Sequence, residues 1–174
     1  MPGAQTFSAE HAMIRLDIPT GMAFDAFTAA FEQAAPPFDT IAALRAGQSP
    51  GGWHEFEAAV AANAPNELVI FGEIEATPLM AIAGHRTKYT EYLLGNPVIA
   101  ESMLRYHPAT MLYAPLRILV HSDDEDRAIL SLDQPSVVFG GFGIPQVADV
   151  GVGLDHKVAN LLRLIGVAPP EVLT

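Results

Sequence analysis

The strand-like segments of this chain come mostly as close neighbours in the sequence. One pair spans 67–76 and 86–95, and a second pair spans 115–122 and 127–133, joined by the acidic tip Asp123–Asp126. Neighbours of this kind are typical of antiparallel hairpins. A doubly wound fold would need strands and helices in regular alternation, which this order lacks. The sequence therefore predicts an α+β fold, in which one antiparallel sheet carries its helices on one face.

The remaining elements follow from apolar periodicity and from capping residues. A strand over 11–18 is expected to end at Pro19, and Thr20 is expected to cap the helix that follows. Further along the chain, the expected elements are a short irregular or helical piece over 77–83, a helix over 97–106, a turn at 111–113 and a last helix over 146–165 that Gly166 stops.

Residues 36–66 stand apart from this strand–helix order. Asp39 or Thr40 is expected to cap a first short helix there. Ser49 and Pro50 form a cap and first-turn pair that is expected to begin a second one. The segment contains no strand pattern, so two inserted helices are predicted.

Charge and composition exclude several classes of protein. The chain has 174 residues, of which 9 are basic and 20 acidic, so its formal net charge is −11. No basic footprint for nucleic acid or anionic lipid is visible, so neither is expected as a partner. The chain has no cysteine, which excludes disulfides and thiolate catalysis. Residues 1–13 lack the basic and apolar regions of a secretion signal, so a cytoplasmic protein is expected.

Size and hydrophobicity favour a single domain over 1–174 that hides apolar surface. Half of the residues, 50%, are hydrophobic, yet no apolar run reaches the roughly 18 residues of a membrane span. A pocket or an oligomer would cover such surface, and we expect a homodimer. Met80, Met103 and Met111 are expected in the core or in the wall of an adaptable apolar pocket.

The stretch Gly95-Asn96-Pro97 marks a corner at which a strand gives way to a helix. Asn96 can accept hydrogen bonds from the first helical turn, and Pro97 suits the first helical position because its φ is preset. Two roles are open for this corner. It can be a capped turn of the fold, or its unused N–H groups and the helix dipole can bind an anion. The capped turn is the favoured interpretation.

Three stretches resemble the domain-of-unknown-function 302 family. They are TEYLLGNPVIAESM, LYAPLRILVHSDDED and DQPSVVFGGFGIPQVADV, in this order. The family's corner has Phe where this chain has Leu94, and its Leu-Pro-Leu-Arg/Lys run is close to 114–117. The resemblance is best over 86–166, and 36–66 looks like a helical insertion of a longer branch. It implies an α+β fold of the TATA-binding-protein-like class, and it implies no established activity or catalytic residue.

The candidate ligand-binding residues lie around this corner and on the strands beside it. They are Asn96, Tyr92, His85, His107, Tyr113 and Arg117. The histidines are dispersed, without an i, i+4 pair or an HExxH motif. No metal site or cofactor is therefore predicted, with haem or metal ligation as the lesser alternative. Gly151 and Gly153 disfavour the last helix by about 1 kcal/mol each, which suits a closely packed element or a pocket wall.

Three functions are compatible with these features. The favoured one is a small-molecule-binding or accessory module without catalysis, with a partly apolar ligand between the sheet and the C-terminal helix and any anionic end at Asn96. The first alternative is an enzyme that acts on a small organic molecule by acid–base catalysis. It requires a histidine beside an acid or a tyrosine in a pocket, from among His85, His107, His121, Glu73 and Glu91. The second alternative is a structural oligomerisation protein.

Overall fold

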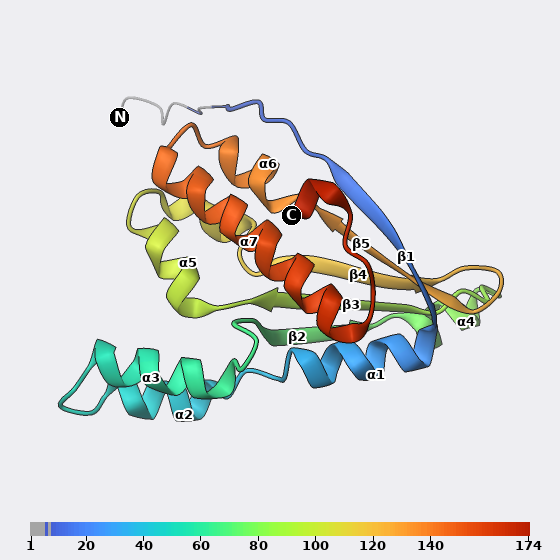
Figure 1. Cartoon of the computed structure of the whole chain (residues 1–174), viewed down its shortest axis with the longest axis horizontal. Helices are drawn as coiled ribbons and strands as arrows, with labels where there is room; N and C mark the ends of the chain where they lie inside the picture. The colour runs from blue at the N-terminus through green and yellow to red at the C-terminus, as the bar shows by residue number, and fades with distance from the viewer. Residues whose placement is uncertain (1–5, 7) are drawn as a thin grey trace.

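The computed structural model describes residue 6 and residues 8–174, and its centre is one five-stranded antiparallel sheet (Figure 1). The strands lie in the order β1-β5-β4-β3-β2, so β1 and β2 form the two edges. Both predicted hairpin pairs are present, because β2 pairs with β3 and β4 with β5. The bounds are Arg15–Ala23 (β1), Val69–Glu75 (β2), Tyr89–Gly95 (β3), Leu116–Ser122 (β4) and Arg127–Asp133 (β5).

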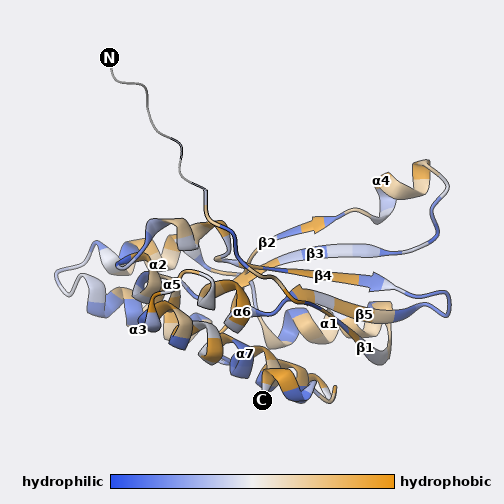
Figure 2. Cartoon of the chain, turned by 90° about the horizontal axis from the view of Figure 1, so that it is seen from above, coloured by the Kyte–Doolittle hydropathy of each residue, from blue (hydrophilic) through white to orange (hydrophobic). Residues whose placement is uncertain are grey.

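Helices α1 and α7 lie on one face of the sheet, and no helix of the described chain covers the other face (Figure 2). This confirms the predicted α+β architecture. No described helix has the length and hydropathy needed to cross a membrane. The helical bounds are Phe24–Ala34 (α1), Thr40–Gly47 (α2), Trp53–Asn63 (α3), Thr77–Ile82 (α4), Pro97–Leu104 (α5), Pro135–Gly140 (α6) and Pro145–Ile165 (α7), with short 3₁₀ helices at Pro108–Leu112 (η1) and Glu171–Leu173 (η2).

The hydrophobic core lies between the sheet and these helices. In α1, Phe27 and Phe31 recur at helical spacing, so both side chains point toward the strands and are buried. Leu154 and Val158 do the same in α7. In β4, side chains alternate between the two faces, and Ile118 is among those that face the helices. One apolar cluster therefore joins the sheet to both covering helices.

Strand β1 differs from the strand predicted over 11–18. It runs through Pro19, which does not end it, and continues to Ala23. Proline is tolerated there because β1 is an edge strand whose free side needs no donor, and the register with β5 shifts between Pro19 and Ala23. The predicted Thr20 cap is also wrong. Its Oγ1 donates to the backbone oxygen of Ala128 at 2.8 Å, and α1 begins without a side-chain cap.

The opposite edge strand, β2, is covered in part by the segment 36–38. The backbone N–H of Ile70 donates to the oxygen of Pro36 at 3.0 Å, and the N–H of Phe38 donates to the oxygen of Ile70 at 2.9 Å. Pro37 forms a parallel bridge with Ile70. The first half of this edge is therefore already hydrogen-bonded within the chain.

Helices α2 and α3 form a pair that extends beyond one end of the sheet (Figure 1). The predicted cap at Asp39 is confirmed, because its side chain accepts from the N–H of Ala42 at 2.9 Å. The predicted start at Ser49–Pro50 is wrong. Ser49 lies in a turn in which its carbonyl accepts from the N–H of Gly52 at 2.9 Å, and α3 begins only at Trp53.

Helix α6 is an element that the sequence analysis missed. Its 6 residues are too few to show an apolar period. The buried carboxylate of Asp155, on α7, accepts from the backbone N–H of Ser136 at 3.0 Å and from Nε2 of Gln134 at 3.2 Å. The same Nε2 donates to the oxygen of Val172 at 3.0 Å. A buried polar network thus joins α6, α7 and the C-terminal segment.

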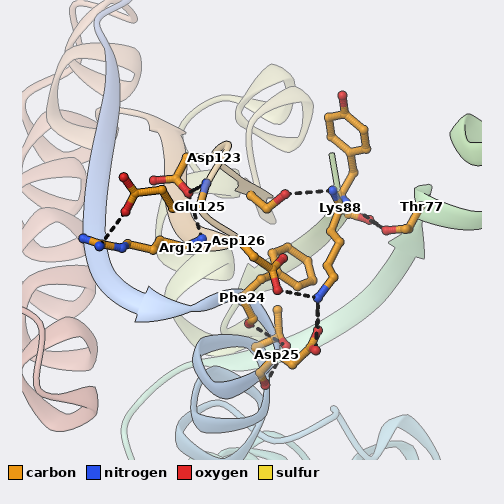
Figure 3. A network of polar contacts seen from close by, with 11 residues as sticks. Phe24, Asp25, Thr77, Lys88, Asp123, Glu125, Asp126 and Arg127 are labelled. Atoms are coloured by element: carbon orange, nitrogen blue, oxygen red, sulfur yellow. Dashed lines mark hydrogen bonds and ion pairs between the residues drawn. The ribbon is translucent and has the colours of Figure 1, made fainter. Parts of the chain in front are cut away.

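At the far end of the sheet, Lys88, directly before β3, connects the start of this strand with two other elements (Figure 3). Its Nζ lies 3.0 Å from a carboxylate oxygen of Asp126, in the β4–β5 hairpin, and 3.0 Å from one of Asp25, in α1. These hydrogen bonds raise the pKa of Lys88 above its ordinary value, and the bond to Asp126 has the larger effect. At the same tip, Asp123 accepts two backbone N–H groups, at 2.9 and 2.8 Å. The acidic tip is therefore an ordered turn.

Candidate functional site

The corner at Asn96 is a fully used helix cap. Its Oδ1 accepts from the N–H groups of Val98 at 2.9 Å and Ile99 at 3.3 Å, and Pro97 has no N–H. The next N–H, of Ala100, donates to the backbone oxygen of Asn96 at 2.9 Å. No N–H of the first turn of α5 is left for an anion. The corner is therefore a capped turn of the fold, which was the favoured interpretation of the sequence.

An apolar hollow opens beneath this corner, and we name it the α5 pocket. Its volume is about 290 Å³. It lies between α5, the ends of β3 and β4, η1 and α7. Almost all of its wall is apolar, and it is lined by Phe71, Leu94, Gly95, Asn96, Pro97, Ile99, Ala100, Met103, Leu104, Met111, Ala114, Pro115, Leu116 and Leu154.

Buried core residues form the floor of the α5 pocket, and exposed residues form its rim. Leu94, Met103 and Leu154 are buried, whereas Phe71 and Met111 are 40% and 54% exposed. Apolar side chains at the rim of an apolar hollow are typical of a binding surface. Met103 and Met111 thus occupy the pocket wall, one of the two places that the sequence predicted for them.

Small residues keep this pocket open. A Cβ at Gly95 would meet Cβ of Pro115 at 3.3 Å and a ring carbon of Phe71 at 3.4 Å, so Gly95 lets both approach the strand closely. Ala100 brings only a methyl group to the wall. A larger side chain at Ala100 would fill space that is now empty.

The six candidate residues from the sequence do not share one site. Asn96 lines the α5 pocket. His107 and Tyr113 line a second hollow, on the other side of η1. Arg117 lies on the open face of the sheet, where its Nε is 3.4 Å from Oε1 of Glu91. His85 is exposed in the connection between α4 and β3.

Tyr92, the sixth candidate, belongs to the core. Its side chain is fully buried, and its hydroxyl donates to Oε1 of Glu32 at 2.7 Å. Burial, helped by the Glu32 carboxylate, raises the pKa of Tyr92 well above its ordinary value. Burial and the nearby Glu32 also raise the pKa of Glu73. The hydroxyl of Tyr92 is therefore engaged with α1, and Tyr92 lines neither the α5 pocket nor the second hollow.

The pairing that acid–base catalysis would require is not formed by the expected residues. Within the described chain, none of His85, His107 and His121 makes a hydrogen bond to Glu73, Glu91 or a tyrosine. Nor do the described residues gather three histidine or carboxylate side chains in a group that could hold a metal ion. The histidine that meets a tyrosine is His11, whose Nε2 lies 2.9 Å from the hydroxyl of Tyr113. The sequence gives no local signal for this contact.

The two helix glycines have different surroundings. A Cβ at Gly151 would lie 2.9 Å from Cβ of Phe139 and 3.0 Å from the oxygen of Pro135, so Gly151 lets α6 pack directly on α7. Gly153 has nothing within 4 Å of such an atom. Close packing, one of the two explanations offered by the sequence, therefore holds for Gly151 alone.

Fold and hollow together define an α+β protein with a half-covered antiparallel sheet and an apolar pocket at one end. The family described as "Domain of unknown function DUF302" matches residues 48–165, so the chain belongs to this family. The family resemblance found in the sequence is thereby confirmed. The match begins inside the segment 36–66 and includes almost all of 86–166.

A solved structure agrees with this assignment. The chain is similar to the crystal structure of an uncharacterized conserved DUF302 protein from Bacillus stearothermophilus, with a TM-score of 0.62 and 12% sequence identity. The similarity covers 88% of this chain and 99% of that one. At this identity it shows a shared fold and nothing about a ligand. The comparison with curated proteins found no match.

Proposed function

We propose that the protein is a small-molecule-binding module that holds an uncharged, largely apolar ligand in the α5 pocket. The observation that carries the proposal is the apolar wall of this hollow, with exposed Phe71 and Met111 at its rim. Its volume of about 290 Å³ is close to the lower limit of about 300 Å³ that is usual for ligand sites, which favours a small ligand.

The polar groups of the pocket favour binding over catalysis. Asn96 is the only polar side chain among the lining residues. Its Oδ1 caps α5, and its Nδ2 donates to the backbone oxygen of Glu67 at 2.9 Å. The wall therefore offers no free acid or base. For the same reason the proposal does not include an anionic end of the ligand at Asn96.

A retained ligand can be tested by native mass spectrometry of the purified protein beside its denatured mass. Extra mass that disappears on denaturation supports the proposal. Affinity can then be measured by calorimetric titration with 3-methylindole, an uncharged apolar probe. Burial of its apolar surface at about 25 cal/mol per Å² is the expected source of affinity.

Two variants localise this binding. Ala100→Phe fills the pocket, and it is expected to raise the Kd for 3-methylindole at least about tenfold, a loss of about 1.4 kcal/mol. Glu101→Phe places the same ring on the same helix at a residue outside the pocket wall. It is expected to leave the Kd unchanged. Equal affinity in all three proteins, or no binding by the wild type, would reject the α5 pocket as the site.

We also propose that the protein forms a homodimer through the open face of the sheet. Leu119 and Ile74, at 37% and 54% exposure, lie on this face beside the ion pair of Arg117 with Glu91. A two-fold dimer brings the same patch of both copies together, so a face with both signs of charge suits self-association. Leu119→Arg is expected to convert a dimer into a monomer in sedimentation experiments. A wild-type monomer at micromolar concentrations would reject this proposal.

A further inference from the structure

A second hollow lies on the other side of η1 and is walled by rings. Its volume is about 440 Å³. Four side chains define it, and we name it the ring hollow: His11, His107, Tyr113 and Phe142. His11 comes from the N-terminal segment, His107 and Tyr113 flank η1, and Phe142 follows α6. The proposed function uses none of these residues.

The rings form a continuous wall of edge-to-face and tilted contacts. The ring centres of His11 and Tyr113 are 5.5 Å apart, those of Tyr113 and Phe142 are 6.0 Å apart, and those of Phe142 and His107 are 5.3 Å apart. The interplanar angles are 78°, 79° and 59°. The ring faces and edges that remain free can add an offset or edge-to-face contact to a planar aromatic guest, which favours such a guest.

The ring hollow also presents hydrogen-bond donors. Nδ1 of His107 accepts from the N–H of Ala109 at 3.2 Å, so the ring proton is on Nε2. No described residue accepts from this Nε2. His11 and Tyr113 share one hydrogen bond, and either direction of it leaves one hydrogen of the pair unused. The lining residues thus carry at least two N–H or O–H hydrogens that no described residue accepts.

The charge around these donors favours an anionic acceptor. The full lining is Ala9, His11, His107, Ala109, Leu112, Tyr113, Val138, Gly141 and Phe142. None of these residues is acidic, although the chain has 20 aspartates and glutamates. A carboxylate in this hollow would meet donors and no like charge in the wall, and hydrogen bonds to a charged acceptor are the strong ones.

We propose that the ring hollow binds a small planar aromatic carboxylate. The aromatic body lies against Phe142 and Tyr113, and the carboxylate accepts from Nε2 of His107 and from the free hydrogen of the His11–Tyr113 pair. This ligand class differs from that of the α5 pocket in both charge and shape.

The N-terminal segment completes this site by close contact with α6. A Cβ at Gly141 would lie 2.9 Å from Cβ of His11, so the segment rests directly on the end of α6 (Figure 1). Gly140, the preceding residue, has nothing within 4 Å of such an atom. Gly141→Ala therefore displaces His11, whereas Gly140→Ala adds the same methyl group in open space.

The test is calorimetric titration of the full chain with three probes. Indole-3-carboxylate is expected to bind. Cyclohexanecarboxylate, which has the charge but no aromatic ring, is expected to bind at least about tenfold more weakly. 3-Methylindole is measured in Ala100→Phe, so that the α5 pocket is filled. It is expected to bind more weakly than indole-3-carboxylate by a similar factor. Equal affinity for a saturated or an uncharged probe would overturn the proposal, as would no binding of indole-3-carboxylate at millimolar concentration.

Variants of the wall then locate the site. His11→Ala and Tyr113→Phe are each expected to raise the Kd for indole-3-carboxylate about tenfold, the usual loss for one hydrogen bond to a charged group. Gly141→Ala should also raise this Kd, whereas Gly140→Ala should leave it unchanged. His54→Ala, at an exposed histidine of α3, controls for loss of a histidine elsewhere. Unchanged affinity in both His11→Ala and Tyr113→Phe would overturn the assignment to the ring hollow.

Discussion

The two ends of the sheet are stabilised by different kinds of contact. At the pocket end, where α5, η1 and α6 gather, α6 packs against α7 through the glycine contact at Gly151 and the buried carboxylate of Asp155. At the hairpin end, Lys88 joins Asp25 and Asp126 through ion pairs whose lysine side chain is 29% exposed. The packing of α6 on α7 at the pocket end thus depends on buried contacts, whereas the hairpin end depends on charges that reach solvent.

This contrast indicates that the pocket end is the more rigid part of the molecule. A ligand site needs walls that keep their position, and buried contacts supply this because their loss leaves clashes or unsatisfied groups. Solvent-exposed ion pairs contribute little and are screened by salt. The pocket end should therefore respond strongly to small substitutions, and the hairpin end weakly.

Gly151→Ala is expected to have the largest effect. The new methyl group would overlap the backbone of α6 and Phe139, and we expect a loss of about 3 kcal/mol in the free energy of unfolding. Gly153→Ala is the matched control, because it meets open space. It should stabilise the protein by up to about 1 kcal/mol through helix propensity. Urea denaturation of both variants measures the difference, and equal stabilities would contradict close packing of α6 on α7.

Asp155→Ala is expected to cost about 2 kcal/mol, because it leaves the N–H of Ser136 without its acceptor and removes one of the acceptors of the Gln134 amide. The control is His156→Ala, at the exposed next position of the same helix, which should stay within about 0.5 kcal/mol of the wild type. Both are measured by urea denaturation. A loss no larger in Asp155→Ala than in the control would show that this buried network contributes little.

Lys88→Met tests the hairpin end. Its melting temperature is expected to fall by only a few degrees, and the gap to the wild type should narrow in high salt. The raised pKa of Lys88 means that the folded state favours the charged amine. Its contribution is therefore present below the ordinary lysine pKa, and it is lost as the pH rises through the folded-state value. Melting curves at several salt concentrations measure this, and a gap that salt leaves intact would argue for a packing role of the lysine stem.

Glu73→Gln is expected to have the smallest effect and the opposite sign. The raised pKa of Glu73 means that ionising its carboxyl is harder in the folded than in the unfolded state. The wild type is therefore penalised at neutral pH, and the variant should gain at most about 0.5 kcal/mol there. This gain should disappear as the pH falls below the ordinary glutamate range. A variant that is less stable than the wild type at neutral pH would contradict the predicted sign of this stability change.

Local patterns in the sequence predicted much of the fold. The close spacing of 115–122 and 127–133 around an acidic tip was sufficient to predict the hairpin of β4 and β5. The caps at Asp39 and Asn96 were recognised because capping involves residues close in sequence. Pro19 misled the prediction of β1, because its tolerance depends on the strand being at an edge, which only the assembled sheet determines.

The candidate sites were predictable only in part. The sequence placed a pocket between the sheet and the C-terminal helix, whereas Leu154 is the one residue of α7 that lines the α5 pocket. Asn96, Met103 and Met111 do line it, and Met80 does not. The contact between His11 and Tyr113 spans 102 positions of the chain. No periodicity or motif reports a pairing of that kind, because it depends on where the N-terminal segment crosses α6.

The edges of the sheet have a consequence for how copies of this protein can associate. β1 carries a proline and a register shift, and the first half of β2 is already bonded to the segment around Pro37. Prolines and irregular edges oppose the strand-by-strand addition that leads to amyloid-like polymers. The edges of this sheet therefore disfavour open-ended growth from strand to strand, and the proposed homodimer, which joins two copies face to face, would be a closed assembly.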